Sequence, residues 1–377
     1  MTDVALHAAE EQAALELRQA REAGLVVLGE RPLNCETPLP AQVGIITPTA
    51  RFYIRSHFDV PRLDPATWRL AVGGLVERPL SLSLPALRRL PSRSLIVTLE
   101  CAGNGRSLME PAVEGEQWQL GAVSTAEWTG VPLVEVLNHA GVKRTAQEVV
   151  FRGADRGTPR GRTNSIRFER SLTLDWARHP DVLLAFAMNG EPLRPDHGSP
   201  LRLVVPGWYG MASVKWLNEV EVVDRPFTGH FQVTSYVFER ERDGLVVKEP
   251  VTRERVRSLI IEPARDETVV RGELVVRGLA WSGQAPVTRV EVSVGGAWEE
   301  ARLLDQSLTY AWRRWELMTQ VETTGDLELR ARARDASGQT QPDRPEWNRL
   351  GYCNNAIQLL PIAVTGDERA ARSTEPG

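Results

Sequence analysis

The chain has 377 residues, enough for two or three domains, and its 42% hydrophobic and 25% charged residues are ordinary for a folded globular protein. The formal net charge of −4 excludes an overall positive field that would attract nucleic acid or an anionic membrane. An anionic ligand therefore has to be drawn in by a local cluster of Arg and Lys. No run of eighteen apolar residues occurs, so no helix is expected to span a membrane.

The first half of the chain predicts a mixture of short helices and strands. Residues 10–23 have helix-forming composition and Gly24 is a suitable stop, which predicts a helical N-terminal arm over residues 1–31. Residues 31–48 read as an extended connection. A second helix is expected at residues 84–90, with Ser83 as its N-cap, and a third at residues 132–139. Strands are predicted in the first half of residues 51–58, at residues 68–72 with a turn at Gly73–Gly74, and at residues 94–99, 201–205 and 214–223. Residues 148–151 and 182–186 are expected to be further buried segments.

The sequence pattern changes near residues 239–245, after which short segments of strand character alternate with turn residues. These strands are predicted at residues 259–261, 268–276, 287–294, 310–316 and 325–335. Such spacing is typical of an immunoglobulin-like β-sandwich, although the antibody pattern of Cys, Trp and Cys is absent. The sequence thus predicts an α+β fold, with a mixed α/β catalytic domain over residues 32–242, a sandwich over residues 243–365 and a disordered tail over residues 366–377.

The cysteines and the N-terminus narrow the chemistry further. Cys35, Cys101 and Cys353 are distant and odd in number, which argues against a disulfide framework. No CxxC, HExxH or Walker A pattern occurs, so neither a standard zinc site nor a P-loop is predicted. Residues 1–24 lack the basic and apolar regions of a signal peptide, which indicates a cytoplasmic protein, or a periplasmic one if a leader is missing from the sequence.

Cys101 directly follows the predicted strand at residues 94–99 and opens a loop with Gly103 and Gly105. A free cysteine in such a place often only fills space in the core. Here the amides of a glycine-rich turn and the guanidinium of Arg106 both favour a thiolate, which can act as a nucleophile or as a soft metal ligand. No histidine pairs with Cys101 in sequence as a base would.

Basic residues accompany other strand ends. Arg55 and His57 follow one predicted strand, Arg202 precedes another, and Lys215 ends a glycine-punctuated loop. A lone Arg is usually a solvated surface residue, but beside a buried strand its charge needs a partner. Guanidinium groups and loop amides are suited to binding phosphate or a tetrahedral oxyanion.

Three separated motifs of the sequence resemble motifs of one known family. Residues 99–107, LECAGNGRS, resemble the cysteine motif of sulfite oxidases and plant-type nitrate reductases. Residues 188–217, which begin MNGEPL and contain DHG, RLVVPG and VKWL, resemble the family's second pterin-binding region. Residues 55–61, RSHFDVP, resemble its Arg-Asn-His and Val-Pro segment. Together the motifs resemble the sulfite oxidase family of molybdenum-cofactor oxidoreductases. The resemblance covers residues 32–361, including the sandwich, which serves homodimerisation in this family.

The resemblance implies a molybdenum ion held by Cys101 and by molybdopterin. The residues that it places around the cofactor are His57, Cys101, Asp155, His197, Arg202, Ser213 and Lys215. The residues that it places around a small anionic substrate, sulfite above all, are Arg55, Arg106, Trp118, Tyr236 and Arg349.

The motifs also depart from the family. Ser56 replaces an Asn, Gly105 stands where animal enzymes carry Arg, and in animal enzymes the Arg that matches Arg349 falls one position later, at Leu350. No haem or flavin module is recognisable, so electrons are expected to leave to a separate acceptor such as a cytochrome. Nitrate, sulfane sulfur and sulfoxides remain alternative substrates. A cofactor-free immunoglobulin-like interaction protein is the alternative from another functional class.

Overall fold

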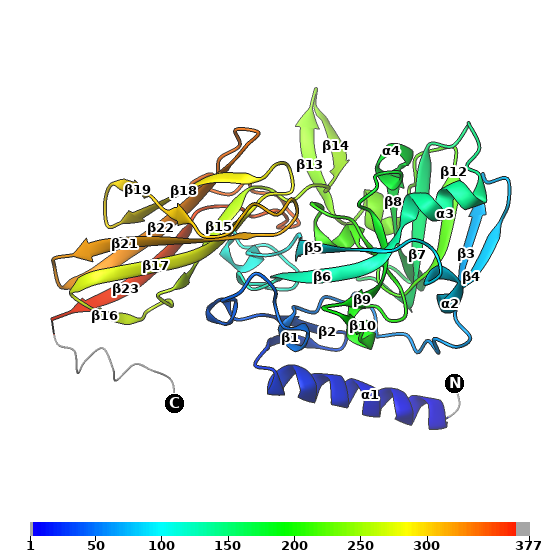
Figure 1. Ribbon diagram of the computed structural model, residues 1–377, viewed down its shortest axis with the longest axis horizontal. Helices are drawn as coiled ribbons and strands as arrows, with labels where there is room; N and C mark the ends of the chain where they lie inside the picture. The colour runs from blue at the N-terminus through cyan, green and yellow to red at the C-terminus, as the bar shows by residue number, and fades with distance from the viewer. Residues whose placement is uncertain (1–2, 367–377) are drawn as a thin grey trace. The chain divides into compact units, whose positions relative to one another are not determined.

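The computed structural model describes residues 3–366, and these form two compact units (Figure 1). The first unit comprises the chain up to Thr37, Ile46–Thr252 and Trp347–Tyr352. The second comprises Pro38–Ile45, Arg253–Glu346 and the chain from Cys353 onward. Strands predominate and helices are few, in agreement with the predicted fold class. Most of the predicted disordered tail, residues 367–377, lies outside the described residues.

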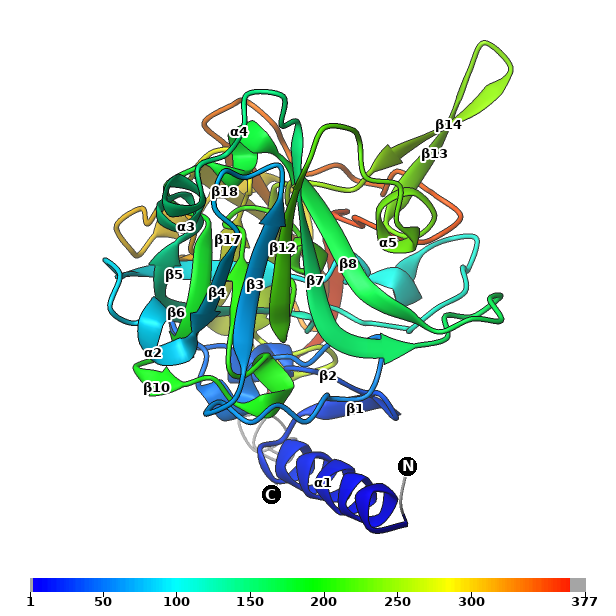
Figure 2. The same cartoon turned by 90° about the vertical axis from the view of Figure 1, so that its right-hand side faces the viewer.

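Two five-stranded sheets form the body of the first unit. One has the order β4-β3-β12-β7-β8 and is antiparallel except for the parallel pair β3 and β12 (Figure 2). Its strands are Leu80–Ser83, Arg69–Gly74, Leu217–Val223, Glu148–Gly157 and Ile166–Thr173. The other has the order β10-β9-β6-β5, with β11 also paired to β9. Its strands are Glu191–Pro192, Leu183–Met188, Val123–Pro132, Arg93–Glu100 and, for β11, Arg202–Val204.

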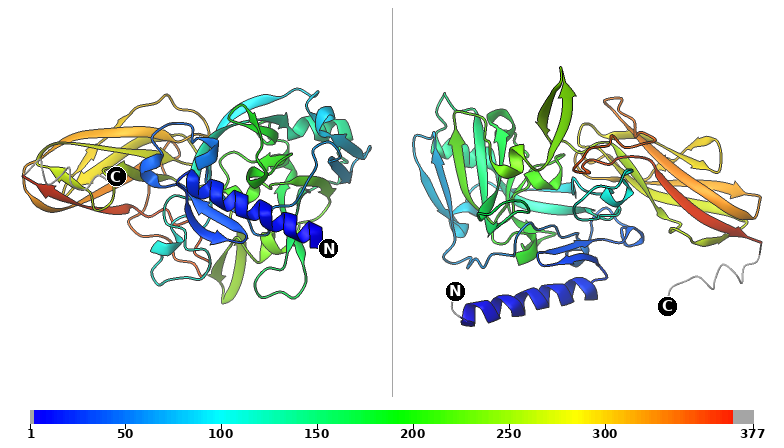
Figure 3. Two further views of the ribbon diagram at one scale, coloured as in Figure 1. Left: turned by 90° about the horizontal axis from the view of Figure 1, so that it is seen from below. Right: turned by 180° about the vertical axis from the view of Figure 1, so that it is seen from behind.

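Short elements connect and cover these sheets. The hairpin of β13 and β14 projects away from the other strands of the first unit (Figure 1). Helix α1 runs alongside the pair β1 and β2 (Figure 3), and Ala20 packs with Leu25, Leu33, Cys35 and Ile54. Among the helices of residues 3–366, none combines the length and apolar character that crossing a membrane requires. The bounds are α1 Asp3–Glu22, β1 Val26–Glu30, β2 Leu33–Glu36, α2 Leu84–Leu87, α3 Leu133–Ala140, α4 Leu174–Ala177, α5 His230–Val233, β13 Val237–Arg242 and β14 Leu245–Pro250.

The predicted strand at residues 51–58 is wrong. A 3₁₀ turn occupies Thr49–Arg51, and Ile54 forms only an isolated bridge with Cys35. The physical reason is burial on all sides: Phe52, Tyr53 and Ile54 are consecutive and all buried, so the segment does not present alternating faces as a half-exposed strand does.

Two other predicted boundaries are also wrong. The strand predicted at residues 214–223 begins only at Leu217, because Trp216 has a φ of +50° and interrupts the extended backbone. Gly73 and Gly74 continue β3 instead of forming a turn. A Cβ on Gly74 would lie 2.2 Å from the carbonyl oxygen of Val222, so the glycine permits the close approach of the neighbouring strand. By contrast, the predicted cap is confirmed, since the hydroxyl of Ser83 accepts the N–H of Ala86.

The second unit is the predicted β-sandwich. Sheets of order β15-β17-β21-β20 and β16-β23-β22-β18-β19 enclose one apolar core that includes Val276, Val290, Trp315 and Leu329. Along β22 the residues Leu329, Ala331 and Ala333 are buried in alternation, as a strand with one core face requires. The strands are β15 Arg257–Glu262, β16 Thr268–Val270, β17 Gly272–Trp281, β18 Val287–Val294, β19 Trp298–Glu300, β20 Arg302–Leu303, β21 Arg313–Val321, β22 Gly325–Asp335 and β23 Gln358–Thr365.

Candidate active site

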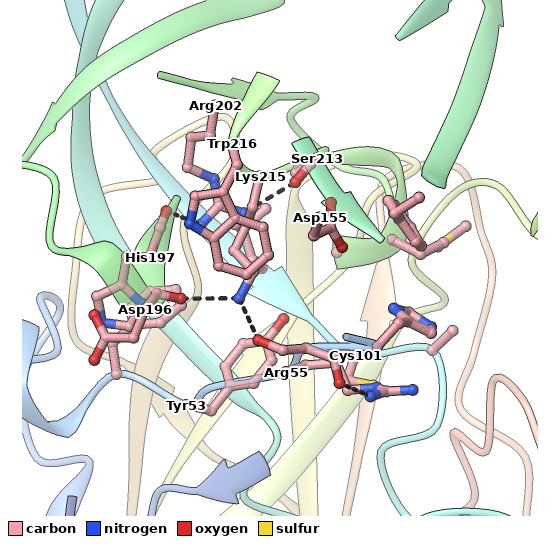
Figure 4. Close-up of a pocket in the computed structure, with 18 of the residues that line it drawn as sticks. Tyr53, Arg55, Cys101, Asp155, Asp196, His197, Arg202, Ser213, Lys215 and Trp216 are labelled. Carbon is pink, nitrogen blue, oxygen red and sulfur yellow. Dashed lines mark hydrogen bonds between the residues drawn. The ribbon is translucent and has the colours of Figure 1, made fainter. Parts of the chain in front are cut away.

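Two cavities in the first unit share a boundary at Cys101. The inner cavity lies among the loop after β5, the loops on either side of β11 and residues 52–57 (Figure 4). The outer cavity is lined by the loop of residues 106–118, the segment before β13 and residues 349–352. Both are lined by Arg55, His57, Cys101 and Tyr236. The inner one also contains Asp155, His197, Arg202, Ser213 and Lys215, and the outer one contains Arg106, Trp118 and Arg349. The structure therefore brings together all of the predicted site residues.

Cys101 is buried where the chain leaves β5. Its backbone N–H donates to Ala122 and its carbonyl accepts from Asn104, which fixes the start of the loop. Burial raises the pKa of the Cys101 thiol, while Arg55, the N–H of Gly103 and Arg106 oppose that rise. A bound metal ion would displace the proton, because coordination deprotonates a thiol outright.

No three His, Cys, Asp or Glu side chains gather as a metal-binding group anywhere in residues 3–366. A metal ion at Cys101 would therefore need its remaining ligands from a bound group.

The inner cavity concentrates basic side chains that bind neutral oxygens. The ammonium of Lys215 donates to the hydroxyl of Ser56 and to the carbonyl of Asp196, each at 2.8 Å (Figure 4). Arg202 donates to the carbonyls of His197 and Ser213 at 3.1 and 3.2 Å. Burial lowers the pKa of Lys215 to about 7 and that of Arg202 to about 10. Cations held in this way are suited to an anionic ligand, which would supply the missing negative charge.

Several buried polar atoms of the inner cavity have no hydrogen-bond partner within the described residues. They are Oδ1 of Asp155, Oδ1 of Asp196 and Nε of Arg202. Burial raises the pKa of Asp155 to about 7, with Lys215 opposing the rise. Native proteins rarely leave such groups unsatisfied, so these atoms indicate that a polar ligand with both donors and acceptors belongs there. A phosphorylated pterin has that character, and the residues present fit it.

The wall between the cavities carries a tyrosine–histidine pair. The hydroxyl of Tyr236 lies 2.7 Å from Nε2 of His57, and the His57 ring stacks on Phe168 at 4.7 Å. Burial raises the pKa of Tyr236, with Arg55 opposing the rise. Burial, together with the charges of Arg55 and Lys215, lowers the pKa of His57 well below its usual value. Tyr236 is therefore protonated and His57 is neutral, so the hydroxyl donates to Nε2 in the His57 tautomer that carries its proton on Nδ1.

Two arginines of the outer cavity are held by hydrogen bonds to neutral oxygens. Arg55 donates to Oδ1 of Asn34 and to the carbonyl of Ser56. Arg106 is buried and donates to the carbonyls of Glu116 and Leu350 at 2.9 and 3.2 Å.

Two further predicted residues stand at opposite extremes of exposure. Arg349 binds both carboxylate oxygens of Glu239 at 2.8 Å, and 61% of its side chain is exposed. It thus lies at the rim of the outer cavity with its charge already paired. Trp118 is fully buried, and its indole N–H has no partner within the described residues.

Sequence reasoning missed four residues around Tyr236. The ring of Tyr352 stacks on that of Tyr236, with centroids 4.9 Å apart. The rings of Phe231 and Phe168 each have their centroid 4.7 Å from that of His57. Arg170 is buried beneath them and donates to the carbonyls of Phe231 and Val251. Phe168 and Arg170 look like ordinary residues of β8, so no sequence signal marks them. Tyr352 lies close in sequence to Arg349, which resembles a pocket residue of the family, and this was the sequence signal that could have indicated it.

The chain is similar to known domain families and proteins. Residues 57–231 match the oxidoreductase molybdopterin binding domain family, and residues 249–364 match the Mo-co oxidoreductase dimerisation domain family. The mitochondrial sulfite oxidase of Homo sapiens is 40% identical over 92% of this chain and 67% of its own length. That of Rattus norvegicus is 38% identical over 91% of this chain and 66% of its own length. The chain thus spans about two thirds of the length of these curated relatives.

Two other relatives carry different names. Nitrate reductase [NADH] 1 of Oryza sativa subsp. japonica is 34% identical over 89% of this chain and 40% of its own length. The sulfane dehydrogenase SoxCD from Paracoccus pantotrophus has a similar structure, with a TM-score of 0.77 and 33% identity over 88% of this chain and 85% of that one. The molybdopterin-binding domain implies a molybdenum cofactor. The chain belongs to the sulfite oxidase family of molybdopterin oxidoreductases, with a molybdopterin-binding domain followed by a Mo-co dimerisation domain.

Proposed function

We propose that this protein oxidises sulfite to sulfate, with Cys101 as the thiolate ligand of molybdenum. The reaction takes sulfite and water to sulfate, two protons and two electrons. The observation that carries the proposal is the position of Cys101 at the boundary of two cavities, beside Arg55 and near Arg106. A cofactor held in the inner cavity would then meet a small anion that enters through the outer one.

The inner cavity would hold the pterin and its phosphate. Lys215 and Arg202 supply positive charge and N–H donors, and the neutral rings of His197 and His57 line the same cavity. Asp155 and Ser213 supply oxygens that can bind N–H groups of the pterin. When bound, the cofactor supplies the two-electron redox chemistry, and the protein supplies position and electrostatics.

The outer cavity would orient the anion. Arg55 and Arg106 place two guanidinium groups next to Cys101, which favours a tetrahedral or pyramidal oxyanion at that spot. Arg349 would join them only after leaving Glu239, so we assign it a weaker role in binding. The fully buried Trp118 would form an apolar wall that excludes water.

Tyr236 and His57 would transfer protons that the reaction releases. The hydroxyl of Tyr236 faces His57, whose neutral Nε2 can accept a proton that the hydroxyl passes on. Electrons would leave to a separate acceptor such as a cytochrome, and the dimerisation domain would join two copies of the chain.

A second candidate is oxidation of sulfane sulfur, which the structural similarity to the sulfane dehydrogenase favours. Reduction of nitrate is a third, since a plant nitrate reductase is a relative, and sulfoxides are a fourth. Membership of an enzyme family argues against a cofactor-free interaction protein.

Steady-state assays of the molybdenum-loaded protein with sulfite, sulfane sulfur, nitrate and sulfoxides, each with an artificial electron carrier, test the proposal. For Arg55→Met we expect kcat/KM for sulfite to fall about a hundredfold with molybdenum content unchanged, because one anion-binding guanidinium is lost. Arg62→Met, which removes an exposed arginine from the same stretch of chain, is the matched control and should leave turnover unchanged. No sulfite turnover in the loaded wild-type protein would refute the proposed function, and unchanged turnover in Arg55→Met would refute the anion-binding role of Arg55.

A further inference from the structure

Tyr352 contacts two of the residues that the proposed function uses. Its ring stacks on that of Tyr236, with centroids 4.9 Å apart and planes at 23°. The guanidinium carbon of Arg106 lies 5.1 Å from the centroid of the same Tyr352 ring. Tyr352 is buried and lines the outer cavity. One side chain therefore touches both the hydroxyl-bearing residue and an arginine of the anion pocket.

The backbone of Tyr236 needs such support. Its φ is +56°, a left-handed conformation that is costly for a bulky residue unless the surroundings hold it. Its carbonyl accepts the N–H of Val251 at 2.8 Å, and its own N–H donates to the hydroxyl of Tyr352. The left-handed conformation in turn brings the hydroxyl of Tyr236 to His57. Tyr352 thus supplies one of the contacts that fix the direction of this hydroxyl.

Tyr352 is itself held firmly. The side chain of Asn348 accepts the N–H of Tyr352 at 2.9 Å and donates to its carbonyl at 2.8 Å. Gly351 has a φ of +64°, and a Cβ there would lie 2.5 Å from Val113 and 2.9 Å from Arg106. Only glycine lets the chain pass so close to the arginine. The segment that carries Tyr352 is therefore built to approach the anion pocket.

We infer that Tyr352 is a positioning residue that aligns the Tyr236 hydroxyl through its own hydroxyl and steadies the Arg106 guanidinium through its ring. The inference rests on the proposed function for its kinetic consequences, although the alignment itself does not depend on the substrate. The two halves of the Tyr352 side chain act on different residues, so they can be removed separately.

Tyr352→Phe keeps the ring and removes the hydroxyl. We expect kcat for sulfite to fall about tenfold with KM within about twofold of wild type, because Tyr236 is misaligned while Arg106 keeps its aromatic neighbour. Tyr352→Leu removes both contacts and should in addition raise KM about fivefold, since a cation–π contact to a substrate-binding arginine is lost. Tyr310→Phe, which deletes a hydroxyl in the second unit, is the matched control and should change neither constant.

A second measurement is independent of turnover. Nitrogen NMR of the histidines in the full chain without substrate reports the hydrogen bond at Nε2 of His57, with the signal assigned by its loss in His57→Gln. We expect Tyr352→Phe to shift this signal and Tyr310→Phe to leave it in place. A wild-type signal together with wild-type kcat in Tyr352→Phe would overturn the inference. If the wild-type protein does not oxidise sulfite, the proposed function fails while the NMR signal still decides the role of Tyr352.

Discussion

Replacing Gly103 with alanine should weaken binding of the anion while sparing the fold. A Cβ on Gly103 would lie 2.8 to 2.9 Å from the terminal guanidinium atoms of Arg106. The backbone of Gly103 is not left-handed, so alanine is allowed there, and the clash is with the far end of a flexible side chain. The guanidinium must therefore recede by about half an ångström to reach ordinary contact.

The cost can be worked from the contacts of Arg106. Receding strains its 2.9 Å hydrogen bond to the carbonyl of Glu116, and a charged hydrogen bond contributes about 1.5–3 kcal/mol. If the same displacement is felt by a bound anion, kcat/KM for sulfite should fall about ten- to hundredfold, since about 1.4 kcal/mol corresponds to a factor of ten. The free energy of unfolding should fall by no more than about 2 kcal/mol, because the hydrogen bond is strained and not lost, and alanine also restricts the unfolded chain.

Steady-state kinetics, molybdenum analysis and chemical denaturation of the same preparation check this prediction. Gly73→Ala is the matched control, because no atom lies within 4 Å of a Cβ built there and its backbone is also not left-handed. We expect the control to keep both kinetic constants. Wild-type kcat/KM in Gly103→Ala would show that the position of Arg106 does not govern substrate binding. A parallel loss of molybdenum would assign the effect to the loop of Cys101 instead.

Three further predictions concern the cofactor and the core. Lys215→Met should stabilise the cofactor-free protein by about 2 kcal/mol at pH 6, because burial lowers the pKa of Lys215 in the folded state to about 7 from an ordinary 10.5. This figure is about half of the free energy that corresponds to the pKa difference, since the amine is partly exposed. Between pH 7 and 10.5 the unfolded chain binds the Lys215 proton more tightly than the folded chain, so the extra stability of the variant should decrease across that range. Denaturation curves at several pH values check this prediction. Extra stability that increases with pH would contradict it. Cys101→Ser should remove the thiolate-to-molybdenum absorption band of the loaded protein, while the free energy of unfolding without cofactor changes by less than about 1 kcal/mol; an unchanged visible spectrum would refute its role as ligand. Gly278→Ala should destabilise the second unit by about 3 kcal/mol or more in thermal unfolding. The added Cβ would lie 2.2 Å from the carbonyl oxygen of Leu259 and 2.1 Å from the ring of Trp315. A wild-type melting temperature would show that the neighbouring strands can move apart without a loss of stability.

The inner cavity was largely predictable because its residues come from compact motifs. Cys101 follows a strand and precedes glycines, and Arg202 and Lys215 flank a glycine-punctuated loop, so short-range patterns locate them. The strands β18 and β22 were predicted with the bounds observed, because apolar residues alternate along β22 and from Val290 to Val294 in β18.

The outer cavity was less predictable because its contacts join distant parts of the chain. No local pattern reveals that Glu239 pairs with Arg349, or that Tyr352 stacks on Tyr236, more than a hundred residues earlier. The strand predicted at residues 51–58 failed for a related reason: its consecutive buried side chains follow tertiary packing instead of a local period.

The path of the backbone has a consequence for how this architecture can be cut or inherited. Within residues 3–366 the chain passes back and forth between its two units, with Pro38–Ile45 and Trp347–Tyr352 each assigned to the unit other than that of their neighbours in sequence. No single break separates one complete unit from the other. A gene fragment that stopped at Thr252 would encode Cys101 and Tyr236 and yet lack the Tyr352 ring that stacks on Tyr236. Neither unit can therefore be produced whole from one uninterrupted segment of this chain.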